Sequence, residues 1–245
     1  MKGRFPRRWI GLILLFLTAS VVCADADGWV RVRRVADGDT IVLQDGRHVR
    51  YIGIDTPEID HENHRAEPMG FEARAMNRHL VDGWQLRLVQ DREKKDRYGR
   101  ILAYVYRRDG LFVNAEMLNQ GCGYLLSRFP NISKEQELLT FQRDAMQHAR
   151  GIWTLVRKDA QPPHALLGNR RSRRFHAHNC PMGKRISEKN RIWLENEWTA
   201  FWSGYSPAKE CIVFPRQNEN GGPRPSISQI TTRFYAATGA IGVRP

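Results

Sequence analysis

Two acidic turns of this 245-residue sequence carry side chains that bind divalent metal ions in proteins. The turn ADGDT places Asp39 at the start of one predicted strand, and the segment RYIGIDTPE ends a later strand at Asp55. A hairpin turn between the strands folds them side by side and brings the two carboxylates together. Carboxylates in contact repel each other unless a cation lies between them. Because Ca²⁺ accepts oxygen ligands in flexible numbers, Asp39, Asp55 and the Thr56 carbonyl indicate a Ca²⁺ site.

The same aspartates have a simpler interpretation as turn formers. Asp37, Asp39 and Asp55 all lie beside predicted turns, where aspartate side chains often bond to the nearby backbone. The motif DGDT alone does not separate this interpretation from a metal site. His61 and His64 follow in a polar loop, and we expect them to be surface residues.

Two arginines favour an anion-binding function. Arg50 alternates in phase with Ile52 and Ile54, so its guanidinium is expected to face inward among apolar side chains. A buried guanidinium needs a fixed partner, which is either Glu58 or an anionic ligand such as phosphate. Arg100 lies at a turn into another strand, where it either points at the same place or remains a solvated turn residue.

The elements that must position these residues are mainly strands, with helices between and after them. Apolar periodicity predicts strands in segments 30–35, 40–44, 47–54, 85–89 and 101–106. Helices are predicted from Ala73 to Leu80, from a cap at Asn114 to Gly121, and from a capping box at Ser133 and Gln136 to Gly151. This order predicts a mainly β plus α fold, namely a five-stranded OB-fold barrel with packed helices.

Five segments, in order, resemble the staphylococcal nuclease (thermonuclease) family: RVADGDTIVL, RYIGIDTPE, DRYGRILAYVY, NAEMLNQG and GIW. The resemblance covers about residues 30–154, and three of the motifs agree in both order and spacing. It implies an OB-fold barrel and a Ca²⁺-dependent phosphodiesterase that acts on DNA and RNA. It also implies the roles of six residues: the Ca²⁺ ligands Asp39, Asp55 and Thr56, the phosphate-binding Arg50 and Arg100, and Glu58, which activates or orients the attacking water.

The resemblance further assigns substrate binding to Arg97, Tyr98 and Phe129. Tyr98 matches a tyrosine that helps to hold the nucleotide in the family. A pair of tyrosines expected after NQG falls instead on Ser127 and Phe129. Because Phe129 can stack on a base and Ser127 cannot, we expect affinity and base preference to differ from the family.

The N-terminus has the pattern of a secretory signal. Basic residues precede an apolar run at residues 9–23, and ADA at residues 24–26 offers the small residues of a cleavage site. The run is shorter than the roughly 20 residues that span a bilayer. We therefore expect a cleaved signal peptide over residues 1–26 and a secreted or periplasmic protein without stable membrane insertion, with an uncleaved anchor as the alternative.

The composition changes after the nuclease-like domain, which we place at residues 28–156. Residues 157–169 are predicted to be a linker, residues 170–215 a small basic α+β unit with cysteine and histidine, and residues 216–245 a disordered tail. The run NRRSRRF adds charge that binds phosphates without sequence preference. We therefore expect the small unit to act as an accessory tether to the substrate.

A second metal site is suggested in the small unit by His176, Cys180 and Cys211. These residues resemble part of a zinc module appended to bacterial nuclease domains, but Ala208 stands where a fourth ligand is expected. A closed structural Zn²⁺ site normally has four ligands. His178 could substitute, yet we favour a degenerate site or a disulfide between the two cysteines over Zn²⁺.

The charge of the chain is compatible with DNA and RNA as partners. Lys and Arg number 39 and Asp and Glu 26, which gives a net charge of +13 and attracts polyanions. The rival hypothesis is a catalytically silent OB-fold module that binds nucleic acid or protein. Glu58 favours the enzyme, because a pure binder has no need of a carboxylate near a polyanion. We expect a monomer.

Overall fold

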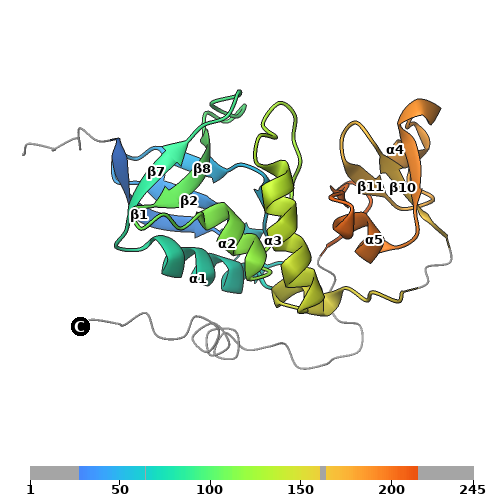
Figure 1. Ribbon diagram of the computed structural model, residues 1–245, viewed down its shortest axis with the longest axis horizontal. Helices are drawn as coiled ribbons and strands as arrows, with labels where there is room; N and C mark the ends of the chain where they lie inside the picture. The colour runs from blue at the N-terminus through green and yellow to red at the C-terminus, as the bar shows by residue number, and fades with distance from the viewer. Residues whose placement is uncertain (1–27, 64, 161–163, 215–245) are drawn as a thin grey trace, which may run out of the picture.

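The computed structural model describes residues 28–63, 65–160 and 164–214 (Figure 1). The predicted signal peptide, His64 and the predicted tail lie outside the described residues. The barrel strands are β1 (Trp29–Asp37), β2 (Thr40–Leu43), β3 (His48–Tyr51), β7 (Gln85–Val89) and β8 (Ile101–Arg107). Two short strand pairs are β4 (Ile54–Asp55) with β9 (Tyr124–Leu125) and β5 (Ile59–Asp60) with β6 (Arg65–Ala66). The helices beside them are α1 (Gly70–Val81), α2 (Val113–Asn119), α3 (Glu135–Gln147) and the 3₁₀ helix η1 (Gly151–Leu155).

The five long strands close into a barrel in the order β1, β2, β3, β8 and β7. β2 and β3 pair antiparallel through the predicted hairpin, where Gly46 has a φ of 88° and donates its N–H to the Leu43 carbonyl at 3.0 Å. β3 then runs parallel to β8. In Figure 1, α1 lies along one side of the barrel and α3 stands between the barrel and the C-terminal part. The predicted barrel with packed helices is confirmed.

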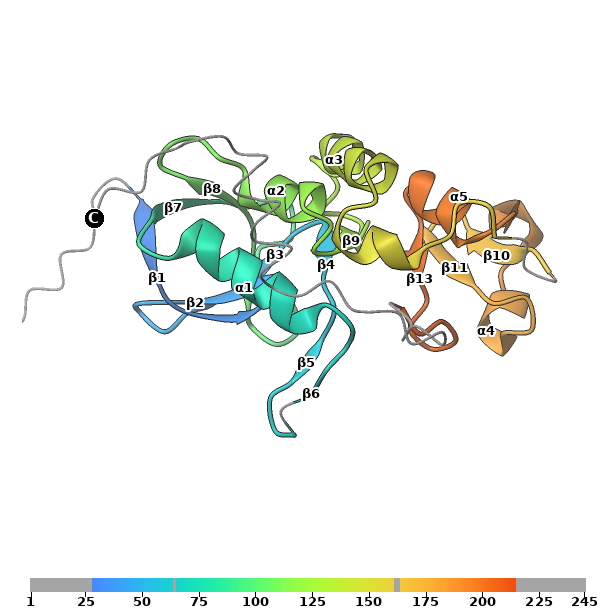
Figure 2. The same ribbon diagram turned by 90° about the horizontal axis from the view of Figure 1, so that it is seen from below.

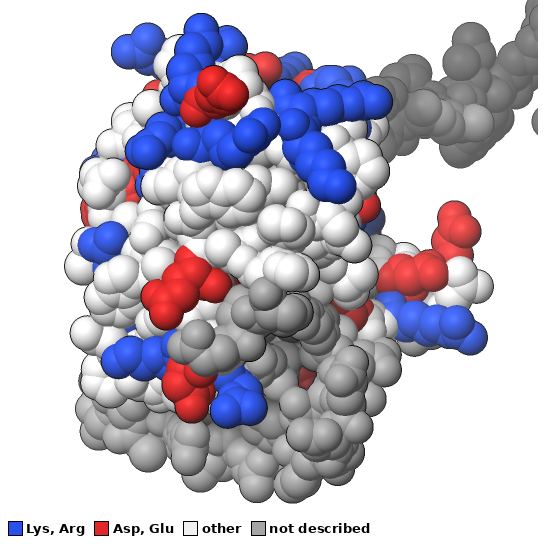
Figure 3. Space-filling view, turned by 90° about the vertical axis from the view of Figure 1, so that its right-hand side faces the viewer, with Lys and Arg blue, Asp and Glu red and all other residues white. Residues whose placement is uncertain are grey.

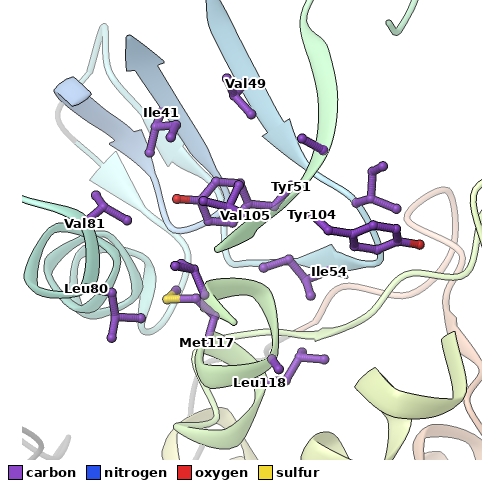
Figure 4. Close-up of a cluster of buried hydrophobic side chains, with 14 of the residues drawn as sticks. Ile41, Val49, Tyr51, Ile54, Leu80, Val81, Tyr104, Val105, Met117 and Leu118 are labelled. Carbon is purple, nitrogen blue, oxygen red and sulfur yellow. The ribbon is translucent and has the colours of Figure 1, made fainter. Parts of the chain in front are cut away.

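The barrel core follows the alternation of the strands. In β3, Val49 and Tyr51 are buried and face the helices (Figure 4). Leu80 of α1 and Met117 of α2 pack against the same cluster. Burial of each such side chain contributes about 1.5–3 kcal/mol to folding. This core fixes the strands whose ends carry the acidic turns.

Three local predictions were wrong. The strand predicted for residues 47–54 stops at Tyr51 and resumes at Ile54, because Gly53 turns the chain with a φ of 80°. The capping box at Ser133 does not form, since α3 begins at Glu135 without a side-chain cap. Asn114 is not a cap either. It lies buried within α2, accepts the Val105 N–H at 2.9 Å and donates to the Ile52 carbonyl at 2.8 Å.

Residues 164–214, which we call the C-terminal unit, form a second small α+β structure. Its sheet has the strand order β12 (Arg191–Leu194), β10 (Leu166–Asn169), β11 (Arg174–His176) and β13 (Ser206–Pro207). Its helices are α4 (Pro181–Lys184), η2 (Glu188–Asn190) and α5 (Glu197–Trp202). Because β10 begins at Leu166, the unit starts before the predicted boundary at Arg170. In the described part of the chain, no helix has the length and apolar character needed to cross a bilayer.

The C-terminal unit shares a hydrophobic core with the barrel domain and packs directly against it. Trp153 and Tyr124 of the barrel domain pack against Phe201 and Phe214 of the unit. The buried side chain of Gln142 in α3 accepts the Leu125 N–H at 2.6 Å and donates to the Phe201 carbonyl at 2.7 Å. Figure 2 shows β4 and β9 on the side of the barrel that faces the unit.

We predict that Phe201→Ala lowers the free energy of unfolding by about 3–5 kcal/mol, as expected for truncation of a fully buried phenylalanine. Phe129→Ala removes the same atoms from a side chain that is 75% exposed, and we expect it to change stability little. Urea unfolding of both variants measures the difference. Equal stabilities would show that the two domains do not depend on their shared core.

Candidate active site

The two predicted metal ligands meet at one end of the barrel. Asp39 lies in the turn between β1 and β2, and Asp55 ends β4. One nitrogen, Nη2 of Arg50, lies 3.0 Å from Asp39 Oδ2 and 2.7 Å from Asp55 Oδ1. The Asp39 Oδ2 atom also accepts the Thr56 N–H at 3.1 Å and the Thr56 hydroxyl at 3.2 Å. Thr56 thus holds the Asp39 carboxylate in place.

Arg50 is fixed by four contacts, and Glu58 is not its ion-pair partner. Its Nη1 donates to the carbonyls of Tyr51 at 2.9 Å and Ile54 at 2.8 Å. Its Nη2 contacts the two aspartates described above. The inward guanidinium therefore has both backbone and carboxylate partners, which is the condition for burying such a charge.

One cavity of about 400 Å³ is lined by most of the predicted catalytic and metal-binding residues. Its lining includes Asp39, Arg50, Asp55, Glu58 and Arg100. Thr56 lies beside Asp39 rather than in this lining. We call this space the catalytic cavity from here on.

Glu58 and Arg100 occupy more exposed positions of the catalytic cavity than the aspartates. The Glu58 side chain is 60% exposed. The side-chain Nε–H of Arg100 donates to Asp96 Oδ2 at 2.7 Å, and the backbone N–H of Arg100 donates to Asp96 Oδ1 at 3.0 Å. Asp96 therefore orients the guanidinium while the two Nη groups stay available to an anion.

The two buried aspartates lie close enough to repel each other. Burial raises the pKa of Asp39 to about 6, and the nearby Asp55 and Glu58 carboxylates act in the same direction, against the lowering effects of Arg50 and Thr40. Arg50 places one positive charge between the two aspartates. A divalent cation at the same place would add positive charge beside them.

Tyr124 and Gly123 contact Asp55, and no sequence pattern predicted either contact. The Tyr124 hydroxyl donates to Asp55 Oδ2 at 2.8 Å, and β9 pairs with β4 to place it there. A Cβ atom at Gly123 would lie 2.4 Å from the Asp55 carbonyl oxygen, so only glycine permits this approach. The sequence GCGYLL contains a strand pattern but nothing that identifies Asp55 as its partner.

The C-terminal unit contributes side chains to the catalytic cavity. Lys209 Nζ lies 2.9 Å from Glu58 Oε1 and 3.1 Å from Asp55 Oδ2. Burial lowers the pKa of Lys209, but the Asp55 and Glu58 carboxylates outweigh it and leave this pKa raised. Arg174 also lines the cavity and donates from Nη1 to Ser206 Oγ at 2.6 Å. Neither residue lies in a motif that pointed to the site.

The three predicted substrate-binding residues lie around the cavity mouth. Arg97 lines the cavity and donates from Nη2 to the Tyr98 hydroxyl at 2.7 Å. Tyr98 and Phe129 are 69% and 75% exposed, which leaves both rings open to solvent. Asn131 joins their two loops, because its side chain accepts the Glu93 N–H at 2.8 Å and donates to the Glu93 carbonyl at 2.8 Å.

Two further predicted residues have simple structural roles. His61 is exposed and its Nε2 lies 3.0 Å from Asp37 Oδ1, as expected for a surface residue. Ser127 donates its hydroxyl to Glu135 Oε2 at 3.1 Å. The serine thus bonds to α3 rather than facing a base.

The cysteine and histidine group of the C-terminal unit is brought together as well. His176 Nδ1 lies 3.6 Å from Cys180 Sγ and 3.5 Å from Cys211 Sγ. Both cysteines are free thiols. The three ligand atoms lie within 4.8 Å of one another, close enough to contact one metal ion.

A cavity lined by carboxylates and arginines at one end of the barrel is compatible with a site that acts on phosphodiesters. Comparison with known proteins agrees. Residues 48–155 match the family described as Staphylococcal nuclease homologue. A protein of Escherichia coli described as an uncharacterized endonuclease is 35% identical over 159 residues, which are 64% of this chain and 93% of that protein. The chain belongs to the staphylococcal nuclease family.

Other relatives carry the same kind of name. The thermonuclease of Staphylococcus hyicus is 35% identical over 127 residues, which are 51% of this chain and 75% of that protein. Endonuclease YncB of Bacillus subtilis is 35% identical over 130 residues, which are 51% of this chain and 61% of that protein. The protein is therefore a nuclease, a hydrolase of phosphodiester bonds, in a family that is generally metal-dependent.

Proposed function

We propose that this protein is a Ca²⁺-dependent nuclease that hydrolyses DNA and RNA with little sequence preference. The observation that supports it most is the shared lining of one cavity by Asp39, Asp55, Glu58, Arg50 and Arg100. The alternative interpretation of the aspartates as turn formers does not account for a guanidinium held between two of them.

The donor set fits a hard divalent ion. Asp39 and Asp55 present carboxylate oxygens within reach of one cation, and the Thr56 carbonyl is next to them in the chain. We propose these three groups as the Ca²⁺ ligands. When bound, Ca²⁺ supplies positive charge that stabilises a phosphoryl group under attack.

The remaining residues bind and orient the reactants. Arg50 and Arg100 both line the cavity. Arg100 can donate from its Nη groups to non-bridging phosphate oxygens, where negative charge develops during attack. Arg50 has its Nε–H free for a phosphate oxygen, because its Nη groups bond to carbonyls and carboxylates. Glu58 accepts a hydrogen bond from a water molecule and either orients it or removes its proton. Water then attacks phosphorus in line with the leaving oxygen, and the P–O bond on the opposite side breaks. The products are a phosphate monoester and a hydroxyl.

The lack of sequence preference follows from the residues at the cavity mouth. Tyr98 and Phe129 offer exposed rings on which any base can stack, and Arg97 contacts the phosphate backbone. Figure 3 faces the C-terminal unit and shows Lys and Arg side chains gathered over its upper part. The exposed cations of this unit include Arg170, Arg171, Lys184, Arg185 and Lys189. Such charge binds phosphates regardless of sequence.

We predict that Tyr98→Ala and Phe129→Ala each weaken binding of a short single-stranded oligonucleotide by about 1–3 kcal/mol, the value of one stacked base. Fluorescence anisotropy in Ca²⁺ with the Glu58→Gln background, which slows turnover, measures the affinity. Trp193→Ala removes an aromatic ring of similar exposure from the C-terminal unit and serves as the control. Losses that are equal for all three variants would contradict a stacking site at the cavity mouth.

One experiment separates the enzyme from the silent binding module. The mature chain, residues 27–245, is incubated with single-stranded DNA and with RNA, first in Ca²⁺ and then in a chelator. We expect cleavage of both substrates that is lost on chelation. Intact substrate that is nevertheless retarded in a gel would establish the binding module instead.

We also propose that His176, Cys180 and Cys211 hold Zn²⁺. Zinc bonds of about 2.3 Å to sulfur and about 2.0–2.1 Å to nitrogen, at tetrahedral angles, place the S and N atoms about 3.5 Å apart. The observed separations are 3.6 and 3.5 Å, and the free thiols favour zinc over the disulfide. Elemental analysis of the purified full chain should find about one zinc, and Cys180→Ser should lose it. A metal-free protein with a Cys180–Cys211 disulfide would overturn this assignment.

For the cell, we propose a secreted or periplasmic protein that acts as a monomer. The basic residues and the apolar run at the N-terminus support export, and the cavity is complete within one chain. Mass spectrometry of the protein from the producing cell should find a chain that starts at Asp27. A full-length chain retained in the membrane fraction would support the anchor instead.

A further inference from the structure

Lys209 enters the catalytic cavity from a part of the chain remote from the barrel. Its ammonium group bridges Glu58 Oε1 at 2.9 Å and Asp55 Oδ2 at 3.1 Å. Glu58 and Lys209 are 151 positions apart in the sequence. The lysine therefore pairs with the candidate base and with a candidate metal ligand at the same time.

The loop that carries Lys209 is held firmly at both sides. The Ala208 N–H donates to the Phe175 carbonyl at 2.9 Å, which ties the loop to β11. The N–H groups of Cys211 and Ile212 both donate to the Ala208 carbonyl, at 3.0 and 2.9 Å. The backbone at Lys209 is thus fixed, and its side chain is the flexible part that reaches the carboxylates.

The groups that contact Asp55 differ in how easily a divalent ion can displace them from its carboxylate. Arg50 is largely buried and has four contacts, and the Tyr124 hydroxyl is buried against Asp55 Oδ2. The Lys209 side chain is 49% exposed, so solvent can take up its ammonium group at low cost. Of these three groups, Lys209 is the one that an arriving divalent ion can displace.

We propose that Lys209 is a built-in competitor of the divalent ion, so that the C-terminal unit sets the metal affinity of the nuclease site. This inference rests on the proposed function, because it takes Asp55 as a metal ligand. An ammonium group and a divalent cation that share one carboxylate repel each other, so each weakens the binding of the other. Metal binding releases Lys209 from Asp55, and metal loss lets it return.

Isothermal titration of Ca²⁺ into the full chain, without nucleic acid, tests the competition. We expect Lys209→Gln to bind Ca²⁺ about 3- to 30-fold more tightly than the parent, because the ion then no longer displaces an ammonium group from Asp55. Lys209→Arg keeps the charge and should stay within about twofold of the parent. Lys189→Gln removes an exposed charge elsewhere on the same unit and is the matched control.

Equal or weaker Ca²⁺ binding by Lys209→Gln would overturn the role of Lys209 while leaving the Ca²⁺ site intact. An absence of Ca²⁺ binding in every variant, including the parent, would overturn the proposed metal site and this inference together. A second measurement uses the unaltered chain. Acetylation of Lys209 by an amine-reactive reagent, read by mass spectrometry, should rise several-fold when Ca²⁺ is added. Unchanged labelling would contradict the release of Lys209.

Discussion

Glu58→Gln lowers kcat by about 10²- to 10⁴-fold, the range for loss of a general base, while substrate affinity changes little. The amide keeps the size of the side chain and can still accept a hydrogen bond from Lys209. It cannot remove a proton from water. Steady-state cleavage of a short single-stranded oligonucleotide at saturating Ca²⁺ measures the effect.

Glu62→Gln provides the matched control for this prediction. Glu62 is an exposed carboxylate in the turn between β5 and β6, outside the cavity lining. We expect it to keep the parental kcat. If Glu58→Gln also kept the parental kcat, Glu58 would not act on the attacking water. The catalytic cavity would then have no assigned general base.

Arg50→Lys is expected to lower kcat by about 10²- to 10³-fold, the usual loss on removing one group that stabilises the developing charge. Lysine retains the charge but lacks the planar set of donors with which Arg50 contacts two carbonyls and two carboxylates. The loss should appear in single-turnover rates on the same oligonucleotide, which report the chemical step.

Arg47→Lys is the control for Arg50→Lys. Arg47 precedes the same strand, is exposed and pairs with the neighbouring Asp45. Its conservative replacement should leave the rate unchanged. A similar small effect at both positions would mean that positive charge alone, and not the guanidinium geometry, serves the reaction.

The barrel could be predicted from the sequence because residues close together in the chain determine its strands, turns and helices. The Asp45-Gly46 turn, the alternation of β3 and the helix periodicity of α1 each depend on neighbouring residues, and all three formed. The errors arose where tertiary contacts decided the outcome. Asn114 suits a helix cap by its type, yet it lies buried and bonds to Val105 and Ile52 from two different segments.

The part of the candidate site that comes from one stretch of the chain was also predictable. Asp39, Arg50, Asp55 and Glu58 lie close together in the chain, so their meeting follows from one hairpin and one strand pair. Lys209 reaches the cavity only through packing of the C-terminal unit on the barrel domain, which no local pattern specifies.

The shared core gives the C-terminal unit a role in the catalytic cavity. A flexible tether affects only how strongly substrate is held, whereas this unit places Lys209 and Arg174 in the catalytic cavity. The aromatic contacts of Tyr124 with Phe201 and Phe214 connect the residue that bonds Asp55 to the same interface. Changes in the unit are therefore expected to alter the chemistry of the site as well as binding.

The most direct test of the central claim is the rate of single-stranded DNA cleavage as Ca²⁺ is titrated into chelator-treated protein, for the parent, Asp39→Asn and Asp55→Asn. We expect a saturable rise in rate for the parent. Both variants should need much more Ca²⁺, because each loses a charged oxygen ligand. Cleavage that does not depend on Ca²⁺, or equal Ca²⁺ requirements in all three proteins, would contradict a metal-dependent site built on these two carboxylates.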